Sequence, residues 1–313
     1  MGKAKGHRVH PAVGQGILPP DWRERLTSPS VLHRLLVDRG ITLRHQWGQN
    51  FLTDGNILRK IVESCELTPD DAVLEVGAGV GTLTRPLGRG AGWVMALEID
   101  PALVSVLQEA VADLQTVTVL QADALRAEWP ALVQEARRRA GPGGKVKLVG
   151  NLPYYLTSPL LYRWLEGPLD WDLAVLTLQK EAAERLVAGP GSKAYGALSV
   201  LTGVRAEARL VARVSPGCFF PRPLVWSALV VMERKGELAI PPGLMDVLRA
   251  AFGQRRKTLL NALAGSPVAT DREEAAALLR EAGIDPGRRA EELSVREFLA
   301  LATCWTARRQ GAG

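Results

Sequence analysis

Short apolar runs recur through the middle of the chain and alternate with segments whose apolar residues have helical spacing. Five of these runs predict strands, at residues 72–77, 93–100, 116–123, 145–151 and 173–179. Segments between them, such as PALVSVLQEAVADL and PALVQEARRRA, predict helices. Strands that alternate with helices indicate a parallel sheet covered on both faces, so the expected fold class is α/β. Two later runs, 208–214 and 227–234, have no long helix between them and predict an antiparallel edge.

The pattern changes towards both ends of the chain. Residues 1–26 are rich in Gly, Pro and basic groups, which predicts a basic mobile extension. SPSVLHRLLVDRG then predicts a helix that begins at Ser28 or Ser30 and ends at Gly40. After about residue 240 the strand patterns stop and three or four helices are expected. The predicted domains are the extension 1–26, an α/β domain over 27–240 and a helical C-terminal domain over 241–313.

Composition narrows the classes of protein to which the chain can belong. It has 313 residues, of which 47% are hydrophobic, so two domains with a substantial core are expected. No apolar run approaches the length of a membrane span, and the basic N-terminus lacks the apolar region of a secretory signal. Cys65, Cys218 and Cys304 fit no zinc or disulfide spacing, which predicts no metal site and a reducing cytoplasm. A net charge of +6 and a pI of about 9.4 favour an anionic partner such as nucleic acid.

A glycine-rich loop follows the first predicted strand, in LEVGAGVGTLT. Its Gly77 and the two alternate glycines after it allow a tight turn and close approach to a ligand, but their spacing is not that of dinucleotide sites. Glu98 ends the second strand, where a carboxylate can accept hydrogen bonds from a ribose, and Asp123 ends the third. A tight turn without ligand and a helix cap at Asp123 are the structural alternatives. The set resembles the S-adenosylmethionine pocket of the class I methyltransferases.

The fourth predicted strand ends in NLPYY, which indicates a site for a planar ring with an exocyclic amine. Asn151 offers a side-chain carbonyl, Pro153 fixes the direction of the main chain around Leu152, and Tyr154 offers a flat face. Hydrogen bonds from an adenine amine to such acceptors favour the electron-rich nitrogen of a methyl-transfer transition state. Tyr155 is expected to serve packing or support.

GCFFPRPLVWSALV predicts a second aromatic platform before a late strand. Phe219 or Phe220 lies on this Pro-stiffened loop and is expected to stack on the target base. A core Phe at the start of a strand is the alternative.

Taken together, these motifs resemble the KsgA-type small-subunit ribosomal RNA adenine N6,N6-dimethyltransferases. The resemblance runs from about Ser28 to Thr303 and includes GQNFLTD, LEVGAGVGTLT, GNLPYYLTSPLL, SKAYGALSV and FGQRRKTLLNAL. It implies a Rossmann-like class I methyltransferase domain with a small helical C-terminal domain. The implied reaction is S-adenosylmethionine-dependent dimethylation of two adjacent adenines near the 3′ end of small-subunit (16S) rRNA, during ribosome biogenesis. A monomer that acts on a 30S assembly intermediate is expected from the resemblance alone.

The resemblance also implies roles for individual residues. The implied cofactor contacts are Asn50, Leu52, Gly77, Glu98, Asp123 and Asn151. The implied target-adenine contacts are Asn151, Leu152, Pro153, Tyr154 and the stacking Phe219. The implied RNA contacts are Arg255, Arg256 and Lys257 of FGQRRKT, for which a solvated helix face is the alternative.

Departures from the family pattern leave other functions open. Tyr155 stands where the family often has Asn, and Leu224 and Trp226 stand where Lys and Asp are usual. The 23S rRNA adenine methyltransferases of the antibiotic-resistance type share the NLPY arrangement and are one alternative. FGQRRKTLLNAL and SKAYGALSV favour the small-subunit class. A non-catalytic RNA-binding assembly factor and an NAD oxidoreductase are further alternatives. The strand-end acids with Asn151 argue against the first, and the glycine spacing argues against the second.

Overall fold

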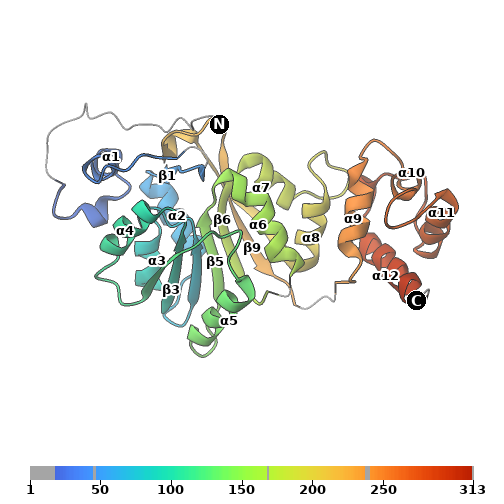
Figure 1. The fold of residues 1–313 in the computed structure, drawn as a ribbon, viewed down its shortest axis with the longest axis horizontal. Helices are drawn as coiled ribbons and strands as arrows, with labels where there is room; N and C mark the ends of the chain where they lie inside the picture. Colours follow the sequence, from blue (N-terminus) through green and yellow to red (C-terminus); the bar gives the residue numbers. More distant parts are fainter. Residues whose placement is uncertain (1–17, 45–46, 168, 237–239, 312–313) are drawn as a thin grey trace. The chain divides into compact units, whose positions relative to one another are not determined.

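The computed structural model describes residues 18–44, 47–167, 169–236 and 240–311, and within them the chain forms two compact units (Figure 1). The first unit contains Met1–Trp164, Pro168–Ala183 and Arg209–Glu233. The second contains Leu165–Gly167, Glu184–Ala208 and Arg234–Gly313. The chain thus passes between the units several times before the predicted boundary near residue 240, and that boundary between domains stays a prediction.

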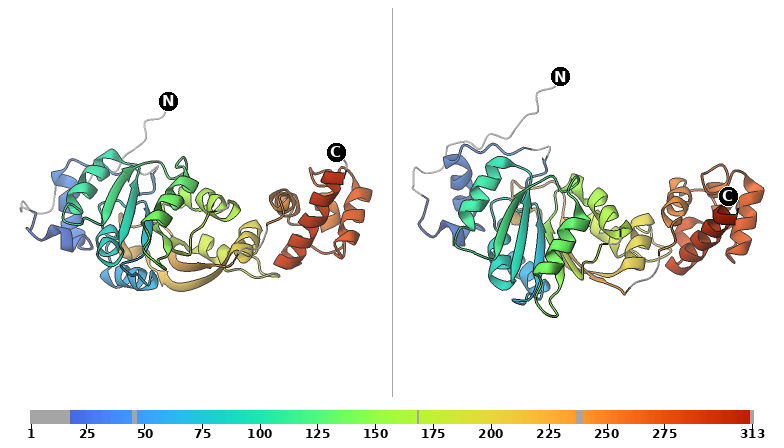
Figure 2. Two further views of the ribbon diagram at one scale, coloured as in Figure 1. Left: turned by 90° about the horizontal axis from the view of Figure 1, so that it is seen from below. Right: turned by 60° about the horizontal axis from the view of Figure 1, so that its bottom comes forward.

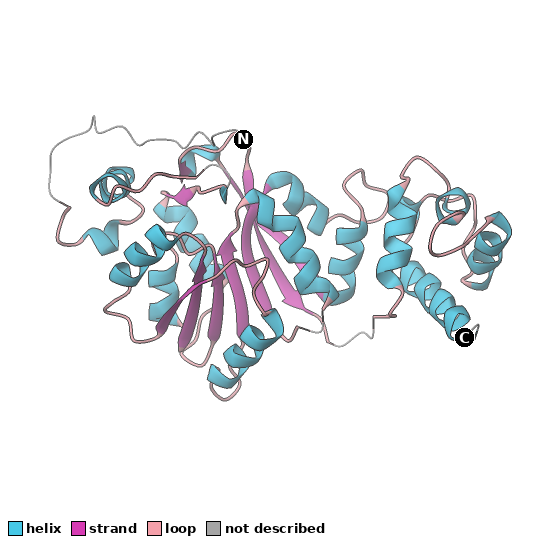
Figure 3. Ribbon diagram, in the orientation of Figure 1, coloured by secondary structure: helices cyan, strands magenta, loops and turns pink. Residues whose placement is uncertain are grey.

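A seven-stranded sheet forms the centre of the first unit (Figure 3). Its strand order is β4-β3-β2-β5-β6-β9-β7, in which β2 to β6 run parallel and β9 pairs antiparallel with β6. The strands are β2 (Ala72–Val76), β3 (Trp93–Glu98), β4 (Val117–Gln121), β5 (Val146–Asn151), β6 (Leu173–Gln179), β7 (Ala206–Val214) and β9 (Ser227–Arg234). The predicted parallel sheet and its antiparallel edge are therefore confirmed.

Helices lie on both faces of this sheet (Figure 2). The central strands β2 and β5 are almost wholly buried, which explains why their sequences are continuous apolar runs rather than alternating ones. The helices up to the end of the sheet are α1 (Pro29–Asp38), α2 (Gly55–Ser64), α3 (Thr84–Gly90), α4 (Pro101–Ala110), α5 (Trp129–Arg139), α6 (Tyr154–Glu166) and α7 (Lys180–Leu186). The chain leaves β2 towards β3 and β4 and then returns to β5 on the other side, so the switch point lies at the carboxyl ends of β2, β3 and β5.

The segment before α1 packs against the sheet domain, which corrects part of the predicted extension. Residues 1–17 lie outside the described residues, but Trp22–Arg25 forms a 3-10 helix in which Trp22 is 7% exposed. Trp22 and Leu26 share a core cluster with residues of α1 and α4. Glu24 forms ion pairs with Arg85 and Arg89 of α3. The prediction of a mobile extension is therefore wrong for residues 22–26, because two large apolar side chains are buried there.

A two-stranded sheet joins distant parts of the first unit. β1 (Phe51–Leu52) pairs antiparallel with β8 (Phe219–Phe220), in the register Phe51 to Phe220 and Leu52 to Phe219. A strand of two residues has no periodicity to detect, so the sequence predicted only a loop before α2. This pairing brings the GQNFL segment beside the FFPRP segment.

The second unit is helical. It contains α8 (Ala197–Arg205), α9 (Leu244–Gly253), α10 (Leu259–Leu263), α11 (Arg272–Glu281) and α12 (Val295–Gly311). Four helices follow residue 240 within the described part of the chain, which confirms the prediction of three or four. The phenol of Tyr195 donates to the carbonyl of Leu293 at 2.9 Å, which ties the segment before α8 to the segment before α12. Among the helices that the structure describes, none is long and apolar enough to cross a membrane.

Candidate functional site

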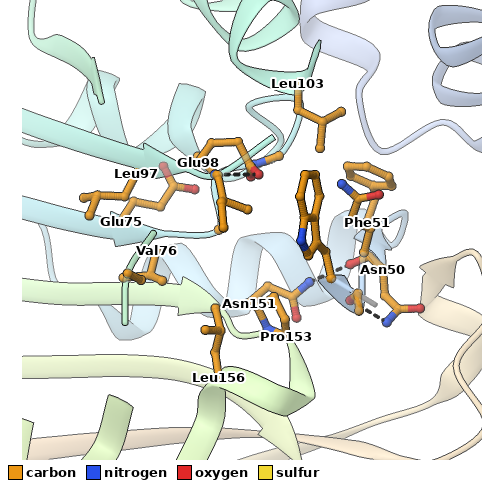
Figure 4. A pocket seen from close by; sticks show the side chains of 18 of the residues that line it. Asn50, Phe51, Glu75, Val76, Leu97, Glu98, Leu103, Asn151, Pro153 and Leu156 are labelled. Atoms are coloured by element: carbon orange, nitrogen blue, oxygen red, sulfur yellow. Dashed lines mark hydrogen bonds between the residues drawn. The ribbon is translucent and has the colours of Figure 1, made fainter. Parts of the chain in front are cut away.

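A pocket opens at the carboxyl ends of β2, β3 and β5, where the topology predicts a ligand site (Figure 4). Glu75 and Glu98 reach it from β2 and β3, and Asn151 and Pro153 lie on a different wall. All six predicted cofactor contacts line this one pocket: Asn50, Leu52, Gly77, Glu98, Asp123 and Asn151.

The glycine loop requires its glycines. Gly77 and Gly79 have φ angles of 71° and 59°, a region that side chains other than Gly rarely adopt. A Cβ on Gly79 would lie 3.0 Å from the Phe51 ring, so this position also lacks room for a side chain. The loop therefore holds its backbone close to the pocket in a conformation that only glycine allows without strain.

Glu98 holds the glycine loop and retains acceptor capacity. Its Oε2 accepts from the Gly79 N–H at 2.8 Å, and its Oε1 accepts from the N–H groups of Ile99 and Asp100 at 2.9 and 3.0 Å. A carboxylate has about four acceptor positions, so one remains on Oε2 for a ligand hydroxyl. Burial raises the pKa of Glu98, and the three N–H donors oppose that shift. The predicted ribose contact is thus compatible with the geometry.

Glu75 contributes a buried carboxyl that lacks a full set of partners. Its side chain is 1% exposed, and within the described structure its Oε2 has no hydrogen-bond partner. Burial raises the pKa of Glu75 to about 8; the Thr84 hydroxyl beside it opposes this shift, and the charge of Glu98 adds to it. A buried carboxyl oxygen without a partner beside a pocket fits a ligand that supplies a hydrogen-bond donor.

Asp123 and Tyr155 form another part of the pocket wall. One Asp123 oxygen accepts from the Leu125 N–H at 2.9 Å within a turn, and the other lies 3.7 Å from Nε of the exposed Arg126. The helix-cap alternative is therefore wrong, because the next helix, α5, begins only at Trp129. Tyr155 is 40% exposed and lines the pocket. Partial burial raises its pKa, followed by the charges of Asp123 and Glu98. Tyr155 thus forms part of the pocket wall, and its role as packing or support stays a prediction.

Asn151 is oriented by the segment before β1. Its Nδ2 donates to the Asn50 carbonyl at 2.8 Å, which leaves Oδ1 as the atom of this amide available to a substrate donor. The Asn50 side chain in turn donates to the Gly48 carbonyl at 2.9 Å. Gln49, which the sequence reasoning missed, donates to Asp100 at 2.9 Å and accepts from the Arg44 N–H at 2.7 Å. Its place in the GQNFL motif, next to the predicted cofactor contact Asn50, was the feature of the sequence that could have indicated a role for Gln49.

The rest of NLPY has divided roles. The Leu152 N–H donates to the Thr177 carbonyl at 3.0 Å, and the Pro153 carbonyl accepts from the Leu156 N–H at 3.0 Å. Because α6 uses the Pro153 carbonyl, the Leu152 carbonyl is the better second acceptor for a substrate amine. Pro153 lines the pocket, whereas the half-buried Tyr154 hydrogen-bonds the Ser227 side chain at the start of β9.

The two candidate stacking residues occupy covered positions. Phe219 is 5% exposed and belongs to the same core cluster as Leu52. Phe220 is half-buried, and its ring meets that of His33 edge-on with centroids 6.1 Å apart. In this conformation Phe219 is a core residue at the start of a strand, which was the alternative to stacking. The stacking role of Phe219 stays a prediction.

The predicted RNA contacts belong to the second unit, in the turn between α9 and α10. Arg255 donates to the carbonyls of Lys193 and Tyr195 at 2.9 and 3.0 Å, so its guanidinium is used within this unit. Arg256 and Lys257 are exposed. Their contact with RNA stays a prediction, and it fits these two residues better than Arg255.

The pocket fits S-adenosylmethionine by the chemistry of its groups. Its acids Glu75, Glu98 and Asp123 suit a ligand with cationic and hydroxyl groups, and Leu97, Ile99 and Leu103 provide apolar walls. The unpaired Oε2 of Glu75 and the remaining acceptor position of Glu98 are the specific observations behind this fit.

Comparisons with known proteins agree with this site. Residues 40–306 match the family described as ribosomal RNA adenine dimethylase. The chain is 43% identical to ribosomal RNA small subunit methyltransferase A of Pelotomaculum thermopropionicum, over 88% of this chain and 96% of that protein. It is 40% identical to the protein of the same name from Latilactobacillus sakei, over 90% and 96%.

Two solved structures share the fold. A dimethyladenosine transferase from Plasmodium falciparum superposes with a TM-score of 0.66 at 26% identity, over 80% of this chain and 95% of that one. The 23S rRNA methyltransferase ErmE superposes with a TM-score of 0.59 at 29% identity, over 81% and 98%. The expected class I methyltransferase fold is confirmed by these neighbours. With the family match covering most of its length, the chain belongs to the ribosomal RNA adenine dimethylase family.

Proposed function

We propose that this protein uses S-adenosylmethionine to dimethylate N6 of two adjacent adenines near the 3′ end of small-subunit ribosomal RNA during ribosome biogenesis. The observation that supports it most is the oriented Asn151 beside a pocket lined by strand-end acids. The similarity to small-subunit methyltransferases over nearly the whole chain favours this substrate over the large-subunit rRNA. The proposal further includes action as a monomer on a 30S assembly intermediate in the cytoplasm.

The chemistry assigns a positioning task to the protein. The adenine amine is a weak nucleophile because its lone pair is delocalised into the ring. Hydrogen bonds from its two N–H groups to Asn151 Oδ1 and the Leu152 carbonyl favour a nitrogen with a more localised lone pair. The cofactor supplies a methyl group that is already activated on a positively charged sulfur. The Asn50 carbonyl, by fixing the Asn151 amide, keeps the acceptor atom facing the amine.

The test is methyl transfer to purified small subunits that lack the two dimethyladenosines, with large subunits as the comparison. Mass spectrometry of the digested RNA locates and counts the methyl groups. Wild-type protein is expected to produce dimethyladenosine at adjacent small-subunit adenines. Methylation of the large subunit alone would move the protein to the antibiotic-resistance class, and binding without transfer would favour the assembly-factor alternative.

The matched variants are Asn151→Ala and Asn56→Ala. Loss of the oriented acceptor is expected to lower kcat by about 100-fold or more, in line with removal of one transition-state hydrogen bond. Asn56 is exposed on α2, so the same chemical change there is expected to leave kcat unchanged. Equal activity of the two variants would contradict the role given to Asn151.

A further inference from the structure

An exposed apolar loop joins β8 to β9 beside the target-base residues. Leu224, Val225 and Trp226 are 100%, 43% and 50% exposed. They are three consecutive members of the six large apolar side chains that are exposed in the described part of the chain. All eight tryptophans lie within the described residues, and Trp226 is the exposed one among them. Such a concentration of apolar surface at one loop indicates a surface for a partner or a ligand.

The loop is held in place at both ends. Pro223 before the exposed run is buried, and Ser227 after it is 3% exposed. The Trp226 carbonyl accepts from the Lys180 N–H at 2.9 Å, which fixes the backbone against the start of α7. The exposure of the three side chains is therefore a property of a fixed loop.

The anchors of this loop are shared with the target-base site. Ser227, the residue after Trp226, hydrogen-bonds the phenol of Tyr154. At the other end, Phe219 of β8 pairs with Leu52, which lines the cofactor pocket. The exposed run thus continues the wall that carries NLPY, so its occupant is expected to be part of the same substrate.

We propose that residues 222–226 form an RNA-binding lip, on which Trp226 stacks an unpaired nucleotide next to the target adenine while Arg222 contacts a phosphate. This inference rests on the proposed function. An enzyme that acts on a base must take it out of its stack, which also leaves the neighbouring base without one partner. An indole face replaces that partner for any base, because stacking does not depend on base identity.

The charge beside the apolar run favours RNA over a second copy of the chain. Arg222 is exposed on the same loop, and the chain carries a net charge of +6. A stable protein dimer requires about 800 Å² of buried surface on each partner, more than three side chains on one loop provide. A cation next to an aromatic side chain is the usual combination for a single strand of RNA.

The first experiment measures the steady-state kinetics of Trp226→Ala with small subunits lacking the dimethyladenosines. Loss of one stacked base is expected to raise KM for the subunit by about tenfold and to leave kcat and cofactor affinity within about twofold. Trp226→Phe keeps a ring and is expected to restore most of the affinity. Leu210→Ala is the matched control, since Leu210 is also apolar and 39% exposed but lies on β7 outside the loop.

The second experiment detects stacking directly. A single-stranded RNA that carries 2-aminopurine beside the target adenine is expected to lose fluorescence on binding the wild-type protein, and to lose much less with Trp226→Ala. If the wild type is active and Trp226→Ala changes neither KM nor the quenching, the proposed RNA-binding lip is overturned. The proposed function is then unaffected. Self-association of the wild type that Trp226→Ala abolishes, with unchanged KM, overturns the lip in favour of a second copy. A wild type that transfers no methyl to small subunits overturns the proposed function instead.

Discussion

Two glutamates on neighbouring strands show how residue surroundings divide roles within one pocket. Glu98 accepts three backbone N–H groups, which fix its position and oppose the rise of its pKa on burial. Glu75 is 1% exposed and has an oxygen without a partner in the described structure, so burial raises its pKa to about 8. The same chemical group is therefore a rigid hydrogen-bond acceptor at Glu98 and a carboxyl that keeps its proton to a higher pH at Glu75.

The pKa of Glu75 has a consequence for stability. Between its ordinary value of 4.5 and about 8, the folded protein keeps a proton that the unfolded chain has lost. The free energy of unfolding of the cofactor-free protein is therefore expected to fall as pH rises through this range. Glu75→Gln removes this dependence and is expected to be more stable than wild type at pH 8 by about 2–4 kcal/mol, with near-equal stability at pH 5.

Urea unfolding at pH 5, 6.5 and 8 measures this difference. Glu128→Gln is the control, because Glu128 is exposed and makes no side-chain cap to α5. Parallel pH profiles for wild type and Glu75→Gln would show that Glu75 ionises normally in the folded protein.

The residue scale also shows what sequence could and could not predict about the site. Glu98, Asp123 and Asn151 were predictable because each ends a strand, and the ends of parallel strands meet at one edge. The orientation of Asn151 was not, because it depends on a carbonyl 101 positions away in the chain. The place of Tyr155 in the pocket wall was not predictable either, since adjacency to a motif does not reveal into which space a side chain points.

Among the elements, strands that are buried on both faces were the easiest to predict. The central strands have continuous apolar runs, and their parallel direction follows from their alternation with helices, whereas their order in the sheet was not predicted. β1 and β8 were not predicted, because two-residue strands form only when their partner is already in place. The Trp22–Arg25 helix was missed because the surrounding residues have the composition of a flexible tail.

A buried ion pair joins the segment before β2 to β5. Lys147 Nζ lies 2.6 Å from Asp71 Oδ2, and both side chains are at most 3% exposed. The Lys147 ammonium also donates to the Glu66 carbonyl at 2.7 Å. Lys147→Met removes one partner and leaves a buried carboxylate, so it is expected to lower the free energy of unfolding by about 3–5 kcal/mol.

Chemical denaturation of Lys147→Met and Arg138→Met tests this effect. Arg138 pairs with Glu135 on the exposed face of α5, so its replacement is expected to leave stability nearly unchanged. The Asp71 carboxylate also accepts from the backbone N–H groups of Thr68 and Lys145. A decrease in the free energy of unfolding below 1 kcal/mol for Lys147→Met would show that these two donors are sufficient.

At the scale of the whole molecule, the three proposed RNA contacts of the second unit differ in their surroundings. Arg255 is hydrogen-bonded within the unit, whereas Arg256 and Lys257 are exposed to solvent. Arg256→Ala combined with Lys257→Ala is expected to weaken binding to small-subunit RNA. It is also expected to reduce the slope of log K against log salt by about one to two. The Arg138→Ala and Arg139→Ala pair removes the same charge from α5 and is expected to leave the slope unchanged. Equal slopes for both double variants would remove Arg256 and Lys257 from the interface.

The placement of α8 limits how this protein can be divided. α8 ends at Arg205 and the last segment of the helical unit begins only at Arg234, yet the buried side chains of α8, including Val200, Leu201 and Val204, belong to that unit. The Gly191 N–H donates to the Glu291 carbonyl at 2.7 Å, a second link across this distance in sequence. Division of the chain near residue 240 therefore separates α8 from α9 and α12, so neither fragment contains the complete helical unit. Transfer of the whole helical unit to another protein would require residues 165–167 and 184–208 together with 234–313.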